Sequence, residues 1–145
     1  MRVVADTGPL VAVSNSRDPA HRLANVIAEA LGRQLVVPEP VVVEVDHLVR
    51  ARVSSEAANR FLQALARREH TVRFSSQAVL ERAVEIDAQF QDLDLGYTDA
   101  VVMAIAERER LPILTFDFTH FRATRPAHGF WQLVVDEQRY REETS

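Results

Sequence analysis

The chain has 145 residues, of which 47% are hydrophobic, so it can form one globular domain over residues 1–145 with a full core and has no room for a second. It contains no cysteine, and all 17 of its basic residues are arginine, which excludes disulfides, thiolate metal sites, Schiff-base lysines and P-loops. The net charge of -4 argues against an extended basic surface that binds nucleic acid, although a local stripe of basic residues is compatible with it.

The first half of the chain predicts alternating strands and helices. In order, these are a strand at Val3–Ala5, a helix that begins at Asp18 and Pro19 and stops at Gly32, a strand at Leu35–Val37, a helix within Val41–Arg52, and a helix that begins at Ser54 or Ser55 and runs through Leu65. An aspartate N-cap followed by proline, and a glycine at the end, are common start and stop signals of helices.

The second half continues the alternation. It predicts a strand at Thr71–Phe74, a helix capped by Ser75 or Ser76 that reaches Phe90, a helix capped by Thr98, a strand at Ile113–Phe116, and a last strand at Trp131–Val135 before a polar tail. Continuously apolar strands separated by helices indicate a mainly parallel sheet covered on both faces. We therefore expect an α/β fold with three α/β/α layers and about five strands, in which ligands bind beyond the carboxyl ends of the strands.

No stretch approaches the roughly 18 uninterrupted apolar residues of a membrane span. The amino-terminal residues lack the basic and apolar regions of a signal peptide. We therefore expect a cytoplasmic protein that does not associate with a membrane.

Four acidic residues interrupt apolar segments. They are Asp6 after VVA, Glu44 within VVVEV, Asp99 in YTDAVV and Asp117 after ILTF. A carboxylate beside buried surface is costly unless it is hydrogen-bonded, paired with a cation or bound to a metal. The alternative is that Asp6 and Asp99 cap turns or helices, that Glu44 lies on an exposed face, and that Asp117 starts a loop. Both interpretations remain open for each acid taken alone.

Oxygen ligands without cysteine suit a hard cation, Mg²⁺ or Mn²⁺, which needs substrate oxygens to complete its shell. Such a cation can promote phosphodiester hydrolysis by generating hydroxide and by stabilising charge on the attacking and leaving oxygens. Together, the four acids therefore point to metal-dependent nuclease chemistry.

The order VVADTGPL, PEPVVVEV, DLDLGYTDAVVMAIAERERLPILTFD and FTHFR resembles a PIN domain, in particular the VapC-type toxin ribonucleases of bacterial toxin–antitoxin modules. The resemblance covers nearly the whole chain, and its most specific part includes the T-x-D-x-x-x-F motif formed by Thr115, Asp117 and Phe121. It implies a three-layer PIN-like fold, Mg²⁺- or Mn²⁺-dependent endonucleolytic cleavage of RNA, a homodimer, and inhibition by a small antitoxin protein.

By this resemblance, the catalytic and metal-binding residues are Asp6, Glu44, Asp99 and Asp117. Many relatives carry a further small polar or acidic residue shortly after the fourth acid, where this chain has Thr119 and His120. This chain therefore departs from the family at a position that concerns the binding of a second metal ion.

Five neighbouring residues have two open interpretations. Thr115 either hydrogen-bonds an acid of the site or reflects the β-propensity of threonine. His120, Arg122 and Arg125 either contact RNA or are solvated loop charges. Asp94 either supports the metal ligands from behind or faces solvent.

Other histidines and aromatic residues have structural interpretations. His21, His47 and His70 show no metal-ligand spacing, so we interpret them as structural or surface residues. Phe130 and Trp131 open an apolar strand and are expected to anchor the core or an interface.

The leading hypothesis is an endoribonuclease acting on single-stranded or loop RNA, whose phosphates can reach a recessed metal. The alternative is a non-catalytic PIN-like module that binds RNA or a protein, and the loss of an acid would favour it. A phosphorylated receiver-like domain needs a lysine at a strand end, and this chain has no lysine.

Overall fold

The computed structural model describes residues 1–145 and has a parallel four-stranded sheet at its centre. The strands are β1 (Val3–Ala5), β2 (Leu35–Pro38), β3 (Thr71–Arg73) and β4 (Ile113–Leu114), arranged in the order β3-β2-β1-β4. The order reverses at β1: β2 and β3 follow on one side of it, and β4 returns to the other. The expected α/β fold with a parallel central sheet is confirmed.

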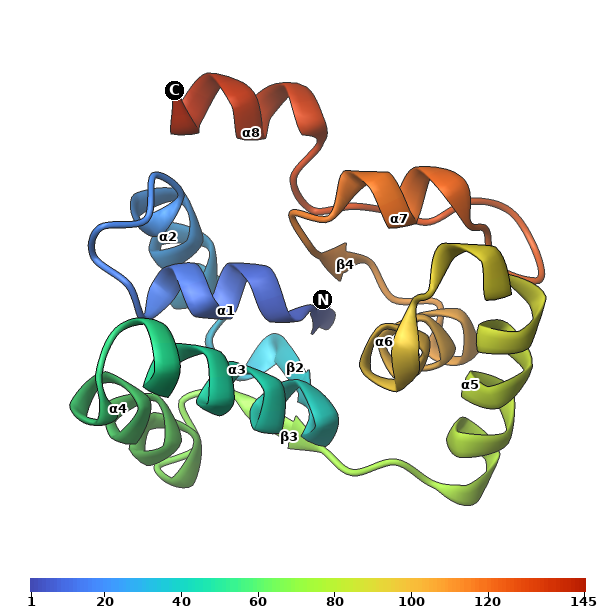
Figure 1. Ribbon diagram of the computed structural model, residues 1–145, viewed down its shortest axis with the longest axis horizontal. Coiled ribbons are helices and arrows are strands. Elements are labelled where there is room, and N and C mark those ends of the chain that lie inside the picture. Colours follow the sequence, from blue (N-terminus) through green and yellow to red (C-terminus); the bar gives the residue numbers. More distant parts are fainter.

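Eight α-helices surround the sheet (Figure 1). They are α1 (Thr7–Val13), α2 (His21–Leu31), α3 (Glu39–Arg52), α4 (Ser55–Ala66), α5 (Gln77–Gln89), α6 (Gly96–Glu109), α7 (Phe118–Ala123) and α8 (Glu137–Thr144), with short 3-10 helices η1 (Gly32–Gln34) and η2 (Gln91–Leu93). Figure 1 shows α1 to α4 gathered on one side of the strands and α5 and α6 on the other. None of the helices is long and apolar enough to cross a membrane.

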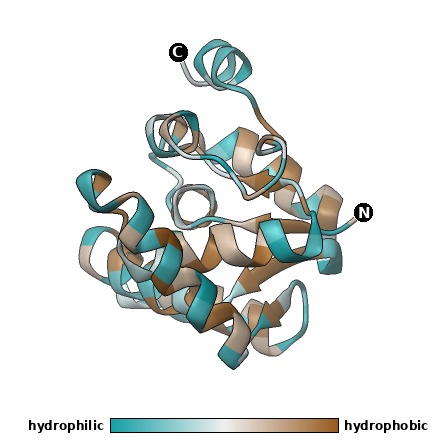
Figure 2. Cartoon of the chain, turned by 90° about the vertical axis from the view of Figure 1, so that its right-hand side faces the viewer, coloured by the Kyte–Doolittle hydropathy of each residue, from teal (hydrophilic) through white to brown (hydrophobic).

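Helix α6 is buried on all sides along its middle. Every residue from Ala100 to Ala106 is buried, and the helix packs against α5, β1 and α3. A helix that is apolar all round belongs inside a protein, so α6 is a fixed part of the core. Figure 2 shows the hydrophobic strands enclosed by more polar helices, with a hydrophilic helix at the carboxyl end. Because α6 is immobilised in this way, the acid in its first turn, Asp99, has a defined position.

Several local signals predicted the helix ends. Ser54 and Ser76 accept hydrogen bonds from Ala57 N and Val79 N, as expected for serine N-caps. Gly32 ends α2 with a positive φ of 53°, a conformation that residues with a Cβ rarely adopt.

Two predicted helix starts are wrong. Helix α2 begins at His21, because Asp18 Oδ1 accepts from Ala20 N within a turn rather than capping a helix at Pro19. Helix α6 begins at Gly96, so Thr98 lies inside it and caps nothing. Leu95 directly precedes α6 and is buried. Its burial fixes the start of the helix at Gly96, three residues before the start that a Thr98 cap would give.

The predicted fifth strand is also wrong. Within Trp131–Val135, only Leu133 forms a bridge, with Ile113, supported by hydrogen bonds from Ile113 N to Gln132 O and from Val134 N to Ile113 O. The pairing cannot extend because β4 itself has two residues before the chain turns towards α7. The sheet therefore has four strands rather than about five.

Three helices lie in segments for which no helix was predicted: α1, α7 and the polar α8. Each begins directly after an aspartate that accepts a hydrogen bond from a backbone amide of the first turn: Asp6, Asp117 and Asp136. The first two of these aspartates are also candidate site residues.

Candidate active site

Asp6 ends β1 and caps α1 from a buried position. It is 5% exposed, its Oδ1 accepts from Thr7 N at 2.9 Å, and its Oδ2 accepts from the Thr115 hydroxyl at 2.7 Å. Burial raises the pKa of Asp6 above its usual value, while these two hydrogen bonds lower it and the charges of Asp117 and Glu44 raise it further. A buried carboxyl held by two donors has a fixed orientation.

Thr115 joins Asp6 to Asp117. Its fully buried hydroxyl donates to Asp6 and accepts from Asp117 N at 3.0 Å. Strand β4 lies beside β1, with Leu114 paired to Ala5, so both strands deliver the next residues to the same edge. Of the two interpretations of Thr115, the hydrogen bond to an acid is the one that the structure shows.

Asp117 begins α7 and faces His120. Its Oδ1 accepts from His120 N at 3.1 Å, and its Oδ2 lies 2.8 Å from His120 Nδ1. Asp117 therefore starts a helix rather than a loop. Capping and membership of the site are compatible, because the cap uses one oxygen and leaves the other for the cluster.

Asp99 lies in the first turn of α6 and is half-buried. Its Oδ2 accepts from His120 Nδ1 at 3.1 Å. The pKa of Asp99 rises to about 7, first because of burial and then because of the negative charge of Asp6, with further increases from Asp117 and Glu44 and a decrease from His120. Asp99 is therefore not a helix cap, and the repulsion that it experiences comes from the other three predicted acids.

Glu44 lies on α3 and is half-buried. Its charge raises the pKa of both Asp6 and Asp99, so its carboxylate is close enough to act on both. No protein group donates a hydrogen bond to it or forms an ion pair with it. Glu44 is thus the acid of the cluster with the most free coordinating capacity. We call Asp6, Glu44, Asp99 and Asp117 the four-acid site.

The donor atoms of this site suit a divalent cation. Single ligand atoms of Asp99, Asp117 and His120 all lie within 4.8 Å of one another. The Thr7 hydroxyl, in the residue after Asp6, is buried without any hydrogen-bond partner, and buried polar groups of that kind are rare in native proteins. Carboxylates that repel one another, together with an imidazole, form a set that a hard or borderline metal ion would stabilise.

His120 lies in this cluster of potential ligand atoms, although the sequence predicts for it only an RNA contact or a solvated loop charge. The available signal was its spacing: a residue three positions after an N-cap aspartate returns to the same end of the helix. Asp94, in contrast, is exposed, with a positive φ of 52°, and does not join the site.

The remaining histidines and aromatic residues lie outside the cluster of acids. His21 Nδ1 bonds to Ala12 O at 2.8 Å, and His70 Nδ1 bonds to Gly32 O at 2.7 Å, which agrees with the structural interpretation of both. Trp131 packs edge-on against Phe121 with ring centroids 5.8 Å apart, whereas Phe130 is 88% exposed and anchors no core. Arg122 pairs with Glu137.

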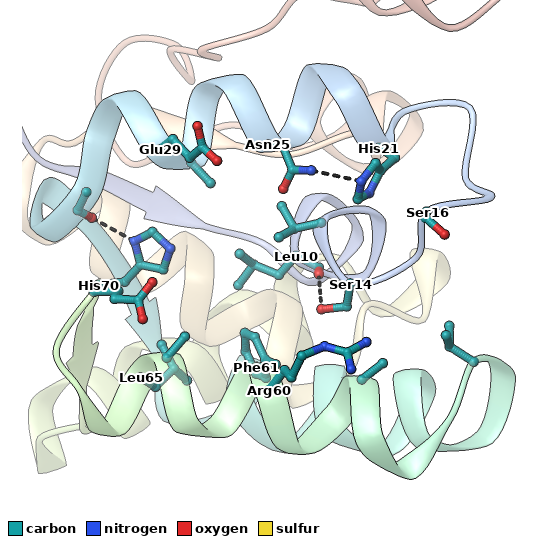
Figure 3. A pocket seen from close by; sticks show the side chains of 17 residues that line it. Leu10, Ser14, Ser16, His21, Asn25, Glu29, Arg60, Phe61, Leu65 and His70 are labelled. Atoms are coloured by element: carbon teal, nitrogen blue, oxygen red, sulfur yellow. Dashed lines mark hydrogen bonds between the residues drawn. The ribbon is translucent and has the colours of Figure 1, made fainter.

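A pocket lies apart from these acids, between α1, α2 and α4 (Figure 3). It has a volume of about 670 Å³ and a mixed apolar and polar lining. Figure 3 shows Leu10 and Phe61 facing the space between α2 and α4, with Arg60 at its side. We call this pocket the α1–α2–α4 groove.

Comparison with known proteins gives consistent matches. The family model of the PIN domain matches residues 3–125. Ribonuclease VapC26 of Mycobacterium tuberculosis is 34% identical over 128 residues, which cover 88% of this chain and 95% of that protein.

Solved structures share the fold at lower identity. The crystal structure of Mycobacterium tuberculosis VapC20, described as a Sarcin-Ricin loop cleaving toxin, matches with a TM-score of 0.72 and 17% identity, over 81% of this chain and 93% of that one. A toxin-antitoxin complex from Klebsiella pneumoniae matches with a TM-score of 0.60 and 24% identity, over 78% of this chain and 84% of that one.

Proposed function

Since the chain belongs to the PIN-domain family and is homologous to the VapC toxin ribonucleases, we propose that its four-acid site binds the divalent cation of an endoribonuclease, the toxin of a toxin–antitoxin pair. The proposed cation is Mg²⁺ or Mn²⁺, and the proposed substrate is single-stranded or loop RNA.

The observation that carries this proposal is the convergence of the acids. Asp6, Asp117 and Glu44 all raise the pKa of Asp99, although they come from different elements of the fold. A fold that served only to bind RNA or a protein would gain nothing from placing four carboxylates where they repel one another. This favours the nuclease over the non-catalytic binding module.

A bound cation would supply Lewis acidity at the scissile phosphate and would lower the pKa of the attacking water. The side chains of Asp99 and Asp117 would hold it. Asp6, fixed by Thr115 and the Thr7 amide, would keep a third carboxylate in a constant orientation. Glu44, which has no protein partner, would orient the attacking water or complete the ligand set.

The arginines that follow Asp117 in the sequence are candidates for contact with the RNA substrate. Arg125 is exposed and forms no ion pair, only two residues after α7 ends. We propose that Arg125 contacts an RNA phosphate, whereas Arg122 is engaged with Glu137.

The test is RNA cleavage by purified protein with Mg²⁺ or Mn²⁺, in the presence and absence of excess chelator. Asp117→Asn should lower the cleavage rate on the order of a hundredfold or more, and it preserves the fold because asparagine is an equally good N-cap. The matched control is Asp94→Asn, at an exposed position whose positive φ asparagine tolerates. Full activity in chelator, or in Asp117→Asn, would refute the mechanism.

The proposed partner is a small antitoxin, because a toxin-antitoxin complex is among the structural neighbours. We propose that it inserts a short apolar segment into the α1–α2–α4 groove and directs an arginine at the four-acid site. Helix α1 connects the two regions, since it begins directly after Asp6 and its residue Leu10 lines the groove. We also propose that the protein is a homodimer, which sedimentation of the free toxin would test.

A further inference from the structure

The imidazole of His120 lies between two carboxylates of the four-acid site. Its Nδ1 is 2.8 Å from Asp117 Oδ2 and 3.1 Å from Asp99 Oδ2. The family resemblance placed only acids in the metal site and left His120 as a departure from the usual pattern.

These separations match those of neighbouring ligands around a metal ion. In an octahedral shell with bonds of roughly 2.1 Å, adjacent ligand atoms are about 3 Å apart. The atom Nδ1 therefore already stands at a ligand-to-ligand distance from two acid oxygens that the proposed function assigns to the cation.

The backbone that carries His120 is firmly held. Its amide donates to Asp117 Oδ1, and its carbonyl accepts from the Thr124 hydroxyl at 2.9 Å. That hydroxyl in turn accepts from Trp131 Nε1 at 3.0 Å, and the next residue, Phe121, is buried against Trp131. These contacts fix the backbone from which the imidazole projects towards the two acids.

We propose that His120 Nδ1 is a ligand of the divalent cation and that it makes the site prefer Mn²⁺ to Mg²⁺. The inference rests on the proposed function and deepens it by naming a ligand and the ion that it selects. Imidazole nitrogen suits transition metals, whereas Mg²⁺ favours carboxylate and water oxygens. The cation would bind the lone pair that Nδ1 carries when the proton of the neutral imidazole is on Nε2.

The direct test detects the nitrogen itself. Full-length, chelator-stripped protein is loaded with Mn²⁺ in a nitrogen-free buffer, and electron spin-echo spectroscopy records coupling of the ion to ¹⁴N. Wild type and the control His128→Asn, which changes an exposed histidine at the far end of α6, should both show the coupling. The variant His120→Ala should lose it.

The outcomes separate this inference from the function on which it rests. If wild type binds Mn²⁺ without ¹⁴N coupling, or if the coupling persists in His120→Ala, His120 is not a ligand although the metal site stands. If wild type binds no divalent cation, the proposed metal site itself fails, and this inference fails with it.

A second variant tests selectivity and does not depend on the stability of His120→Ala. His120→Asp replaces nitrogen by oxygen and turns the set into carboxylates alone. Separate calorimetric titrations with Mn²⁺ and with Mg²⁺ should show that the preference for Mn²⁺, measured as Kd for Mg²⁺ divided by Kd for Mn²⁺, falls by about tenfold or more when the nitrogen ligand is exchanged for oxygen. An unchanged ratio would show that His120 does not select the ion.

Discussion

The hydroxyl of Thr115 donates a hydrogen bond of 2.7 Å to the carboxylate of Asp6, across 109 positions of sequence and between the ends of two neighbouring strands. The same oxygen accepts from the amide of Asp117. One buried hydroxyl therefore sets the orientation of one acid and the position of another.

Replacing this hydroxyl by a methyl group should disturb both acids. Thr115→Val keeps the shape of the side chain but leaves the buried Asp6 with one donor fewer, so the free energy of unfolding should fall by about 1–3 kcal/mol. Urea denaturation would measure the loss, and calorimetry would show weaker Mn²⁺ binding. Thr71→Val is the control, because its hydroxyl bonds to Arg33 O at an exposed position. If both variants lose the same stability, the buried network has no special role.

Metal-free stability should depend on pH through Asp99. Its folded-state pKa of about 7 lies above the ordinary 3.8, so the folded protein retains a proton that the unfolded chain has lost. Asp99 therefore favours the folded state fully below about pH 4, and this contribution is lost as the pH rises to about 7. Denaturant melts of wild type and Asp99→Asn in chelator, from pH 4.5 to 7.5, should show a steeper decline in wild type. Parallel pH profiles would contradict the prediction.

Metal binding should relieve the same repulsion. At about 100 times Kd, a cation that binds only the folded form adds roughly 2.7 kcal/mol, and the melting temperature should rise by several degrees and continue to rise with the logarithm of concentration. In chelator at pH 7.5, Asp99→Asn should be more stable than wild type, and it should respond less to Mn²⁺. Thermal melts of both proteins with and without metal would decide. Equal metal responses would remove Asp99 from the ligand set.

A substitution in the α1–α2–α4 groove should weaken antitoxin binding without affecting RNA cleavage. Ala64 on α4 lines the α1–α2–α4 groove and is half-buried, so Ala64→Arg should fill the groove and weaken antitoxin binding by tenfold or more, about 1.4 kcal/mol. RNA cleavage by the free toxin should be unchanged. The control Gln63→Arg adds the same charge to the exposed face of the same helix. Normal inhibition of Ala64→Arg by the antitoxin would place the partner elsewhere.

Local patterns in the sequence were sufficient for much of the fold. The three-residue strand Val3–Ala5, the serine caps at Ser54 and Ser76 and the glycine stop at Gly32 are short-range features, in which a residue's own conformational preference or its first neighbour decides the outcome. The burial of the apolar strands and their alternation with helices then led to a parallel sheet. The four acids could also be recognised from local sequence, because each interrupts an apolar stretch.

Tertiary structure alone decided what those residues do together. The failed strand at Trp131–Val135 depended on how many residues β4 offers for pairing, and the start of α6 depended on the burial of Leu95. The roles of Thr115 and His120 arose only when β4 lay beside β1 and α7 turned His120 between Asp99 and Asp117. Hydrogen bonds and charge repulsion act over a few ångströms in space, and a sequence does not specify which distant residues will come that close.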